Sequence, residues 1–245
     1  MITNKRFIIF IVFVVIVIGI GVFIKNNFKE DKSMDNKVIS NGENKLYYLG
    51  HASIRIVTSE GKVIYIDPYM GDDYDLSADL VLVTHEHYDH NDVSKVKNKS
   101  KDFRIIRESD ALVDGKYQTF DLGYVSVQAV EAGYNDFHDK SECVGYVITL
   151  SDNTSIYVAG DTTITPMMDE LGSWNIDYVF LPCDGKYTMT VDVAVEASKK
   201  IGAKHNIPYH TANDGRDFDN DIADKFNVEN KIIMKPGDEI VLNHG

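Results

Sequence analysis

Short apolar runs separated by polar turns extend from residue 45 to the end of the chain. Runs of four to eight residues rich in Val, Ile, Tyr and Leu are typical of buried strands. Turn signals such as Ser59-Glu60-Gly61 separate neighbouring runs. The pattern predicts strands over Lys45–Leu49, Ser53–Thr58, Lys62–Ile66, Leu80–Thr84, Phe103–Ile106, Tyr117–Phe120, Tyr124–Val130, Val144–Leu150, Ser155–Ala159 and Tyr178–Leu181.

Helices are predicted for a few stretches between these strands. The third of them starts after Thr190, a suitable N-cap, and stops at Gly202, a residue that favours helix ends. Strands interleaved with a few helices predict an α+β class. The predicted helices are Asn91–Lys97, Thr165–Leu171, Val191–Ile201 and Asp217–Phe226.

The N-terminal segment differs from the rest of the chain. Phe7 to Ile24 form 18 consecutive residues without a charged or polar side chain. As a helix this segment would span about 27 Å, close to the ~30 Å hydrocarbon core of a bilayer. We therefore expect a retained transmembrane signal anchor. A cleaved signal peptide is the alternative, but no small-residue cleavage motif follows, and the lack of a polar face argues against a buried core helix.

The flanking charges predict how the chain is organised. Lys5 and Arg6 favour a short cytoplasmic N-terminus at residues 1–6, followed by the anchor at 7–24. Residues 25–44 are polar and are interpreted as a flexible linker. Residues 45–245 then form one folded domain. A single-pass protein of the cell membrane with its domain outside the cytoplasm is expected.

Composition and charge narrow the partners. The hydrophobic fraction of 44% and the charged fraction of 26% are ordinary for a globular domain. The formal net charge of -13 gives a surface that repels polyanions, so no nucleic-acid partner is expected. Cys143 and Cys183 either pair in an oxidising compartment or remain two buried free thiols.

Three histidines and an aspartate follow the apolar run Leu80–Val83, in the segment Thr84-His85-Glu86-His87-Tyr88-Asp89-His90. Side chains two positions apart in an extended segment point to the same side, so His85 and His87 can hold one metal ion. Asp89 and His90 come where the chain should turn and can reach a second ion. Imidazoles suit zinc, and a carboxylate suits zinc or a harder ion.

This segment resembles the signature of the metallo-β-lactamase superfamily. Further matches lie before and after it in the chain, in the expected order. The chain is similar to a branch of small metal-dependent zinc hydrolases. The resemblance implies a four-layer αββα sandwich of two mixed β-sheets with a metal site at one edge, here preceded by a transmembrane helix. It does not imply a substrate, because this fold hosts many reactions. The further matches are Gly50-His51-Ala52-Ser53, Tyr65-Ile66-Asp67-Pro68, Ala159-Gly160-Asp161-Thr162 and Ile207-Pro208-Tyr209-His210.

The resemblance also implies ligands for two Zn2+ ions per chain. Asp161 would bridge the two ions, and His210 would complete the second. The implied set is His85, His87, Asp89, His90, Asp161 and His210.

The third histidine of the first ion departs from the common pattern. Asn135 stands near the position where many relatives carry it, and His138 follows three residues later. We expect His138 to be the ligand, because an imidazole is a better zinc donor than an amide.

Other residues near these motifs are candidates for supporting roles. Asp89 and His51 are the catalytic candidates: Asp89 to orient the nucleophile, and His51 to face the substrate or else to be satisfied by backbone hydrogen bonds. Asp67 either supports a ligand histidine or belongs to a turn. Lys186 is expected to contact an anionic substrate and Tyr187 to line the pocket, with a plain helix-entry loop as the alternative.

The expected activity is zinc-dependent hydrolysis, in which a metal-bound hydroxide cleaves an ester, lactone, amide or phosphodiester. The substrate is expected to be a small molecule or, given the anchor, a lipid or cell-envelope component. Two alternatives stay open. One is a di-iron redox relative, although such relatives typically carry an acidic residue where His87 stands. The other is a membrane-tethered metal-binding module without turnover.

Overall fold

The structure, a computed structural model, describes residues 41–245. The anchor expected at 7–24 and most of the linker expected at 25–44 lie outside the described residues. Within residues 41–245 no helix is both long enough and apolar enough to cross a membrane.

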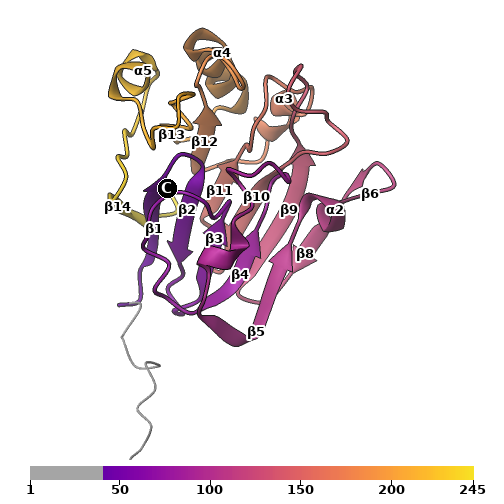
Figure 1. Cartoon of the computed structure of the whole chain (residues 1–245), viewed down its shortest axis with the longest axis vertical. Helices are drawn as coiled ribbons and strands as arrows, with labels where there is room; N and C mark the ends of the chain where they lie inside the picture. The colour runs from indigo at the N-terminus through magenta and orange to yellow at the C-terminus, as the bar shows by residue number, and fades with distance from the viewer. Residues whose placement is uncertain (1–40) are drawn as a thin grey trace, which may run out of the picture. The chain divides into compact units, whose positions relative to one another are not determined.

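Two six-stranded mixed sheets make up the fold (Figure 1). The first sheet has the order β14-β1-β2-β3-β4-β5 and the second the order β13-β12-β11-β10-β9-β8, with a separate β6-β7 pair. The strands of the first sheet are β1 (Asn44–Gly50), β2 (Ser53–Val57), β3 (Val63–Ile66), β4 (Ala78–Leu82), β5 (Lys99–Ile106) and β14 (Glu239–Leu242). The others are β6 (Leu112–Val113), β7 (Lys116–Tyr117), β8 (Thr119–Asp121), β9 (Val125–Glu131), β10 (Val144–Leu150), β11 (Ser155–Val158), β12 (Tyr178–Pro182) and β13 (His205–Tyr209).

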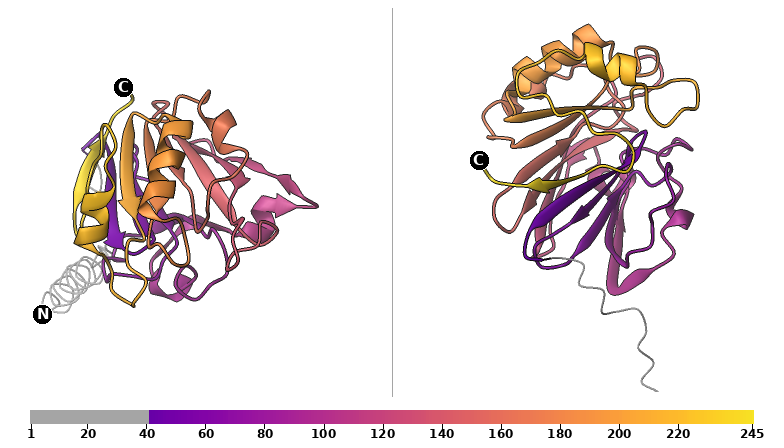
Figure 2. Two further views of the ribbon diagram at one scale, coloured as in Figure 1. Left: turned by 90° about the horizontal axis from the view of Figure 1, so that it is seen from above. Right: turned by 90° about the vertical axis from the view of Figure 1, so that its left-hand side faces the viewer.

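The core lies between the two sheets. Alternate side chains of a strand point to opposite faces, and those facing inward, such as Ile54, Ile56 and Ile148, form one buried apolar cluster. A second cluster lies on the outer face of the second sheet, under the helices seen on that side in Figure 2. These helices are α3 (Met168–Leu171), α4 (Val191–Ile201) and α5 (Asn220–Lys225); α2 (Glu108–Ala111) lies before β6.

A loop covers the outer face of the first sheet. The Tyr65 ring packs on Tyr74, with ring centroids 5.2 Å apart, and the Tyr65 hydroxyl donates to the Leu76 carbonyl. The 3-10 helix η1 (Val93–Lys95) follows, with the Lys95 ammonium 5.3 Å from the Tyr74 ring centroid. The outer layer on this side is therefore built from a loop and one short turn.

The α4 helix was predicted correctly from its local signals, whereas the helices predicted over Asn91–Lys97 and from Thr165 differ from the structure. The α4 bounds match the prediction, and the Thr190 side chain accepts the Val193 N–H as an N-cap. The helix predicted over Asn91–Lys97 is wrong: the Lys95 N–H donates to the Asp92 carbonyl and the Val96 N–H to the Val93 carbonyl, and these i→i+3 bonds form only the short η1. The helix predicted from Thr165 begins at Met168, since Pro166 disfavours a helical residue before it. Cys143 and Cys183 are both buried and free.

Strand direction brings the predicted site residues together. In the first sheet β2 is antiparallel to β1 and β3, and β4 is parallel to β3, so β1, β3 and β4 run the same way. In the second sheet the same argument gives one direction to β9, β11, β12 and β13. Each candidate site residue follows the carboxyl end of one of these seven strands.

Gly160 lies where the two sheets meet. The Val144 N–H donates to the Thr84 carbonyl across this junction at 2.9 Å. Gly160 has a φ of +66°, and a Cβ there would lie 2.9 Å from the Val144 carbonyl oxygen and 3.0 Å from the Thr84 Cβ. Only glycine fits, because both atoms belong to chain segments that the junction fixes.

We predict that Gly160→Ala lowers the free energy of unfolding by about 1–3 kcal/mol more than Gly61→Ala does, through overpacking. Gly61 is the matched control: its φ is +81°, but a Cβ there would meet nothing within 4 Å. Urea unfolding of both variants measures the difference. Equal losses would show that backbone strain alone, and not the close approach of the two sheets, requires glycine at 160.

Candidate metal centre

The predicted ligand residues fall into two neighbouring groups. His85, His87 and His138 offer ring nitrogens that all lie within 4.8 Å of one another. Asp89, His90 and His210 form a second group under the same limit, and His51 joins them. The structure thus brings His138, the residue that the sequence analysis preferred to Asn135, beside His85 and His87.

The Asp161 carboxylate lies between the two groups and is 3% exposed. Its Oδ2 is 3.3 Å from His138 Nε2 and 3.4 Å from His210 Nε2. Its Oδ1 is 3.4 Å from His90 Nε2. One carboxylate therefore faces histidines of both groups, which is the position that a bridging ligand requires.

The Nδ1 atoms of four candidate ligands, His85, His90, His138 and His210, lie next to side-chain oxygens, which leaves Nε2 directed toward the centre. The Thr84 hydroxyl donates to Asp67, so its oxygen accepts from His85 Nδ1 at 3.1 Å. His138 Nδ1 lies 3.2 Å from Asn135 Oδ1. His90 Nδ1 lies 2.8 Å from Asp67 Oδ2, and His210 Nδ1 lies 3.1 Å from Asp184 Oδ2.

The donor atoms fit a bound cation. The Nε2 atoms of His85, His90 and His210 and the Oδ1 of Asp161 are buried without a hydrogen-bond partner. Buried polar atoms are costly when unpaired, so these four, which belong to neighbouring groups of metal donors, indicate a missing partner. Imidazole nitrogens with a carboxylate oxygen are the ligands that zinc prefers in proteins.

The electrostatics of the centre favour positive charge. Burial lowers the pKa of His85 well below its ordinary value, so this ring is neutral and ready to donate a lone pair. Burial also acts to lower the pKa of His90, but the Asp161 and Asp67 carboxylates outweigh it and raise the pKa well above the usual range. The Asp161 and Asp184 carboxylates likewise outweigh burial and raise the pKa of His210 to about 9.

Asp67 combines the two roles that the sequence left open. It has a φ of +45° at the end of β3, so it belongs to a turn. Its carboxylate is fully buried and accepts the Thr84 N–H at 2.8 Å and the Thr84 hydroxyl at 2.7 Å, besides holding His90. It therefore also orients a candidate ligand through a hydrogen bond.

Asp184 and Asn135 are supporting residues that the sequence analysis did not identify. Asp184 follows β12 and, besides His210, accepts the backbone N–H groups of Lys186 and Tyr187. Asn135 accepts the His138 N–H and orients the ring of that residue rather than replacing it. The signal available in the sequence was position: each residue follows a strand that ends at this edge of its sheet.

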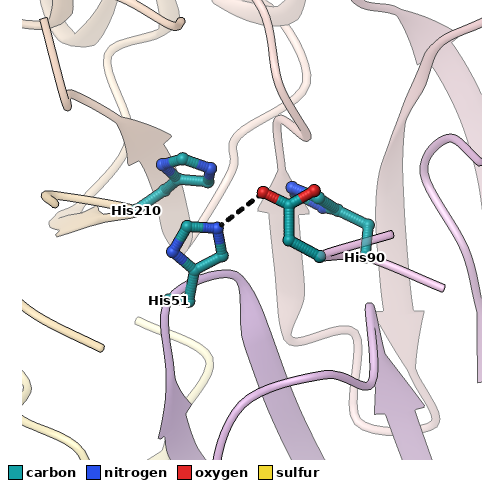
Figure 3. Close-up of side chains that lie close together, drawn as sticks. His51, His90 and His210 are labelled. Carbon is teal, nitrogen blue, oxygen red and sulfur yellow. Dashed lines mark hydrogen bonds and ion pairs between the residues drawn. The ribbon is translucent and has the colours of Figure 1, made fainter. Parts of the chain in front are cut away.

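His51 faces the centre and is 7% exposed. Its Nε2 is 3.3 Å from Asp89 Oδ2, the contact drawn as a dashed line in Figure 3, and its ring centroid is 3.8 Å from that of His210. The Nδ1 atom has no hydrogen-bond partner, so the backbone does not satisfy this ring. Burial raises the pKa of Asp89, but the His51 contact and the charge of His90 outweigh it and lower the pKa.

A cavity of about 430 Å³ opens over the centre. His51, Asp89 and Asp161 line its base, and Tyr187 lines its wall, as the sequence analysis expected for this tyrosine. Lys186 is not among the lining residues described; it is exposed, with its ammonium 4.5 Å from the Tyr187 ring centroid.

The sequence model of a protein family, the β-lactamase superfamily domain, matches residues 45–210 of this chain. With the two mixed sheets and the histidine-aspartate centre at their edge, this match places the chain in the metallo-β-lactamase superfamily. Within it, the chain belongs to the UPF0173 metal-dependent hydrolases. It is 30% identical to the member from Pyrococcus furiosus and 31% identical to that from Thermococcus onnurineus, with 81% of this chain and 99% of each relative covered.

Solved structures agree with this family. A metal-dependent hydrolase structure from Parabacteroides distasonis has 28% identity and a TM-score of 0.64, covering 78% of this chain and 91% of that one. A structure from Thermotoga maritima, assigned as a zinc-dependent hydrolase of the same superfamily, has 25% identity and a TM-score of 0.54 over 75% of this chain and 84% of that one.

We predict that Asp67→Asn lowers metal affinity about 10–100-fold, because the carboxylate that orients His90 is lost. Competition with a zinc chelator measures the affinity. Asp79→Asn is the matched control: Asp79 is a buried aspartate of the same sheet that accepts the Val63 N–H and pairs with Lys62. An equal fall in affinity in both variants would mean that the loss reflects the fold and not the hydrogen bond to His90.

Proposed function

We propose that this chain is a dinuclear zinc hydrolase acting on an ester, lactone, amide or phosphodiester bond. The observation that carries the proposal is the buried Asp161 carboxylate, which contacts His138 of the first donor group and His90 and His210 of the second. Such an arrangement suits two cations that share one carboxylate. The zinc-dependent assignment of the Thermotoga maritima protein supports the choice of metal.

Bound zinc would supply Lewis acidity, which lowers the pKa of a coordinated water and polarises the bond to be cleaved. The residues of this chain supply the geometry. His51 holds the Asp89 carboxylate at 3.3 Å, and the low pKa of Asp89 keeps it ionised so that it accepts a hydrogen bond from the attacking water and orients it. The cavity above these two residues admits the substrate.

Two alternative activities have less support. Di-iron redox relatives typically carry an acidic residue at the position of His87. Here that position is an imidazole, and its Nδ1 lies 3.1 Å from His138 Nε2, within the first donor group. A binding module without turnover is disfavoured by the predicted donors that gather at one cavity. Metal analysis of aerobically purified protein distinguishes a zinc enzyme from a di-iron redox protein. A panel of hydrolysis substrates distinguishes an enzyme from a binding module without turnover.

We predict that His138→Ala removes about one zinc ion per chain and lowers hydrolysis at least 100-fold, since the first group would keep two imidazoles. Elemental analysis and a panel of ester, lactone, amide and phosphodiester substrates measure both effects. His205→Ala is the matched control. His205, at the start of β13, stacks on Tyr178 of β12 and belongs to neither donor group. Full metal content and full activity in the His138 variant would contradict the proposed ligand set.

The proposal extends to location. The segment 7–24 anchors the chain in the cell membrane, and the domain acts outside the cytoplasm on a small molecule or on a lipid or envelope component. The start of the family match at residue 45 supports this, because the apolar segment precedes the hydrolase domain.

We predict that the full-length chain remains in the membrane fraction after an alkaline carbonate wash, because an uncharged 18-residue segment at 7–24 favours the bilayer. Deletion of residues 1–43 is expected to release the domain into the soluble fraction. Protease added to intact spheroplasts is expected to degrade the full-length domain. A carbonate-soluble chain would contradict the anchor, and a protease-resistant domain would contradict the orientation.

A further inference from the structure

Four aromatic side chains surround the opening of the cavity: Tyr69, Tyr88, Phe137 and Tyr187, here called the aromatic mouth. They form two edge-to-face pairs. Tyr69 and Tyr88, from the loops after β3 and β4 of the first sheet, have ring centroids 5.8 Å apart. Phe137 and Tyr187, from the loops after β9 and β12 of the second sheet, have centroids 5.0 Å apart. Each sheet thus contributes one aromatic pair.

Two members of the mouth are open to solvent. Tyr88 is 79% exposed and Phe137 is 51% exposed, and the described residues include only two other exposed large hydrophobic side chains, Val113 and Val241. Isolated exposed apolar residues are common on protein surfaces. Two exposed aromatic rings from loops of both sheets, which line one cavity together with several metal donors, instead provide apolar surface for a ligand to cover.

The charges of the cavity wall argue against a second anionic group on the substrate. Arg216 is the basic residue among the described lining residues, and it pairs with Asp214 at 2.9 Å and Asp219 at 2.6 Å. The Lys186 ammonium, outside the lining, sits over the Tyr187 ring. Apart from the proposed zinc ions and the histidines that would hold them, the one lysine or arginine among the described lining residues is thus already paired with two carboxylates, so a phosphate-rich substrate would find little further charge to bind.

We infer that the substrate is a carboxylic ester, lactone or amide whose acyl side carries an uncharged apolar group, and that this group inserts between the two aromatic pairs. The inference rests on the proposed hydrolytic function. In the reaction the acyl C–O or C–N bond breaks, a water oxygen bonds to the acyl carbon, and the leaving atom takes a proton. The cavity volume of about 430 Å³ falls in the range of about 300–1,000 Å³ typical of small-molecule sites.

The test uses the full-length zinc-loaded chain in lipid nanodiscs with p-nitrophenyl acetate, butanoate and hexanoate, and with bis(p-nitrophenyl) phosphate. We expect kcat/KM to rise on the order of tenfold from acetate to hexanoate, mainly through KM, as partial burial of the added methylenes predicts. Tyr88→Ala and Phe137→Ala should each remove most of this rise at unchanged zinc content. Val241→Ala, at an exposed apolar residue of β14, is the matched control and should retain it.

A second experiment measures ligand binding to the unmutated chain. It tests the inference even if the chain hydrolyses none of these substrates or a variant does not fold. Hexanohydroxamate is expected to bind on the order of tenfold more tightly than acetohydroxamate in calorimetric titration, for the same reason. Chain-length-dependent binding with no turnover of any ester would support the aromatic mouth and overturn the proposed hydrolysis. Turnover and binding that are both independent of chain length, or a preference for the phosphodiester, would overturn the mouth assignment and leave hydrolysis standing.

Discussion

The burial of the Asp161 carboxylate is the constraint on which the rest of the structure depends. A buried carboxylate is strongly unfavourable unless cations or donors surround it. Here His90, His138 and His210 approach it from three separate segments and from both sheets. That meeting is possible only if the carboxyl ends of strands in both sheets reach the same edge. The close approach at Gly160, one residue before Asp161, follows from the same requirement.

The same carboxylates set up a competition between protons and metal. His90 and His210 have raised pKa values because carboxylates outweigh the effect of burial. Protons on these two rings balance the buried negative charge, and a cation that uses the same Nε2 atoms must displace them. Metal affinity should therefore fall as the pH drops through the raised pKa values of His90 and His210. The imidazole of His85, whose pKa is lowered by burial, offers its lone pair without this competition.

Sequence predicted the parts of the site that are local and left out the parts that tertiary contacts create. His85 and His87 were found because their spacing after a strand reports their direction. Asp184 was missed because only the parallel pairing of β12 and β13 brings it to His210. The helix expected at Asn91–Lys97 failed for a similar reason, since contacts with the loop after β3 hold this segment: the Asp92 N–H donates to the Pro68 carbonyl and the Lys95 ammonium to the Tyr69 carbonyl. The family resemblance supplied the sheet architecture, which hydrophobic pattern alone leaves undetermined.

Backbone strain separates the fixed part of this site from its adaptable part. His51, Asp67 and His210 have φ values of +52°, +45° and +46°, a region that costs non-glycine residues of order 1–3 kcal/mol each. Hydrogen bonds hold them there: the His51 carbonyl accepts from the Tyr48 hydroxyl and from the His210 N–H. The aromatic mouth is less constrained, because the Tyr88 and Phe137 side chains are largely exposed to solvent. Changes in the mouth can therefore alter substrate preference while the strained, buried residues preserve the metal chemistry, which is why membership of the family identifies a metal-dependent hydrolase but not its substrate.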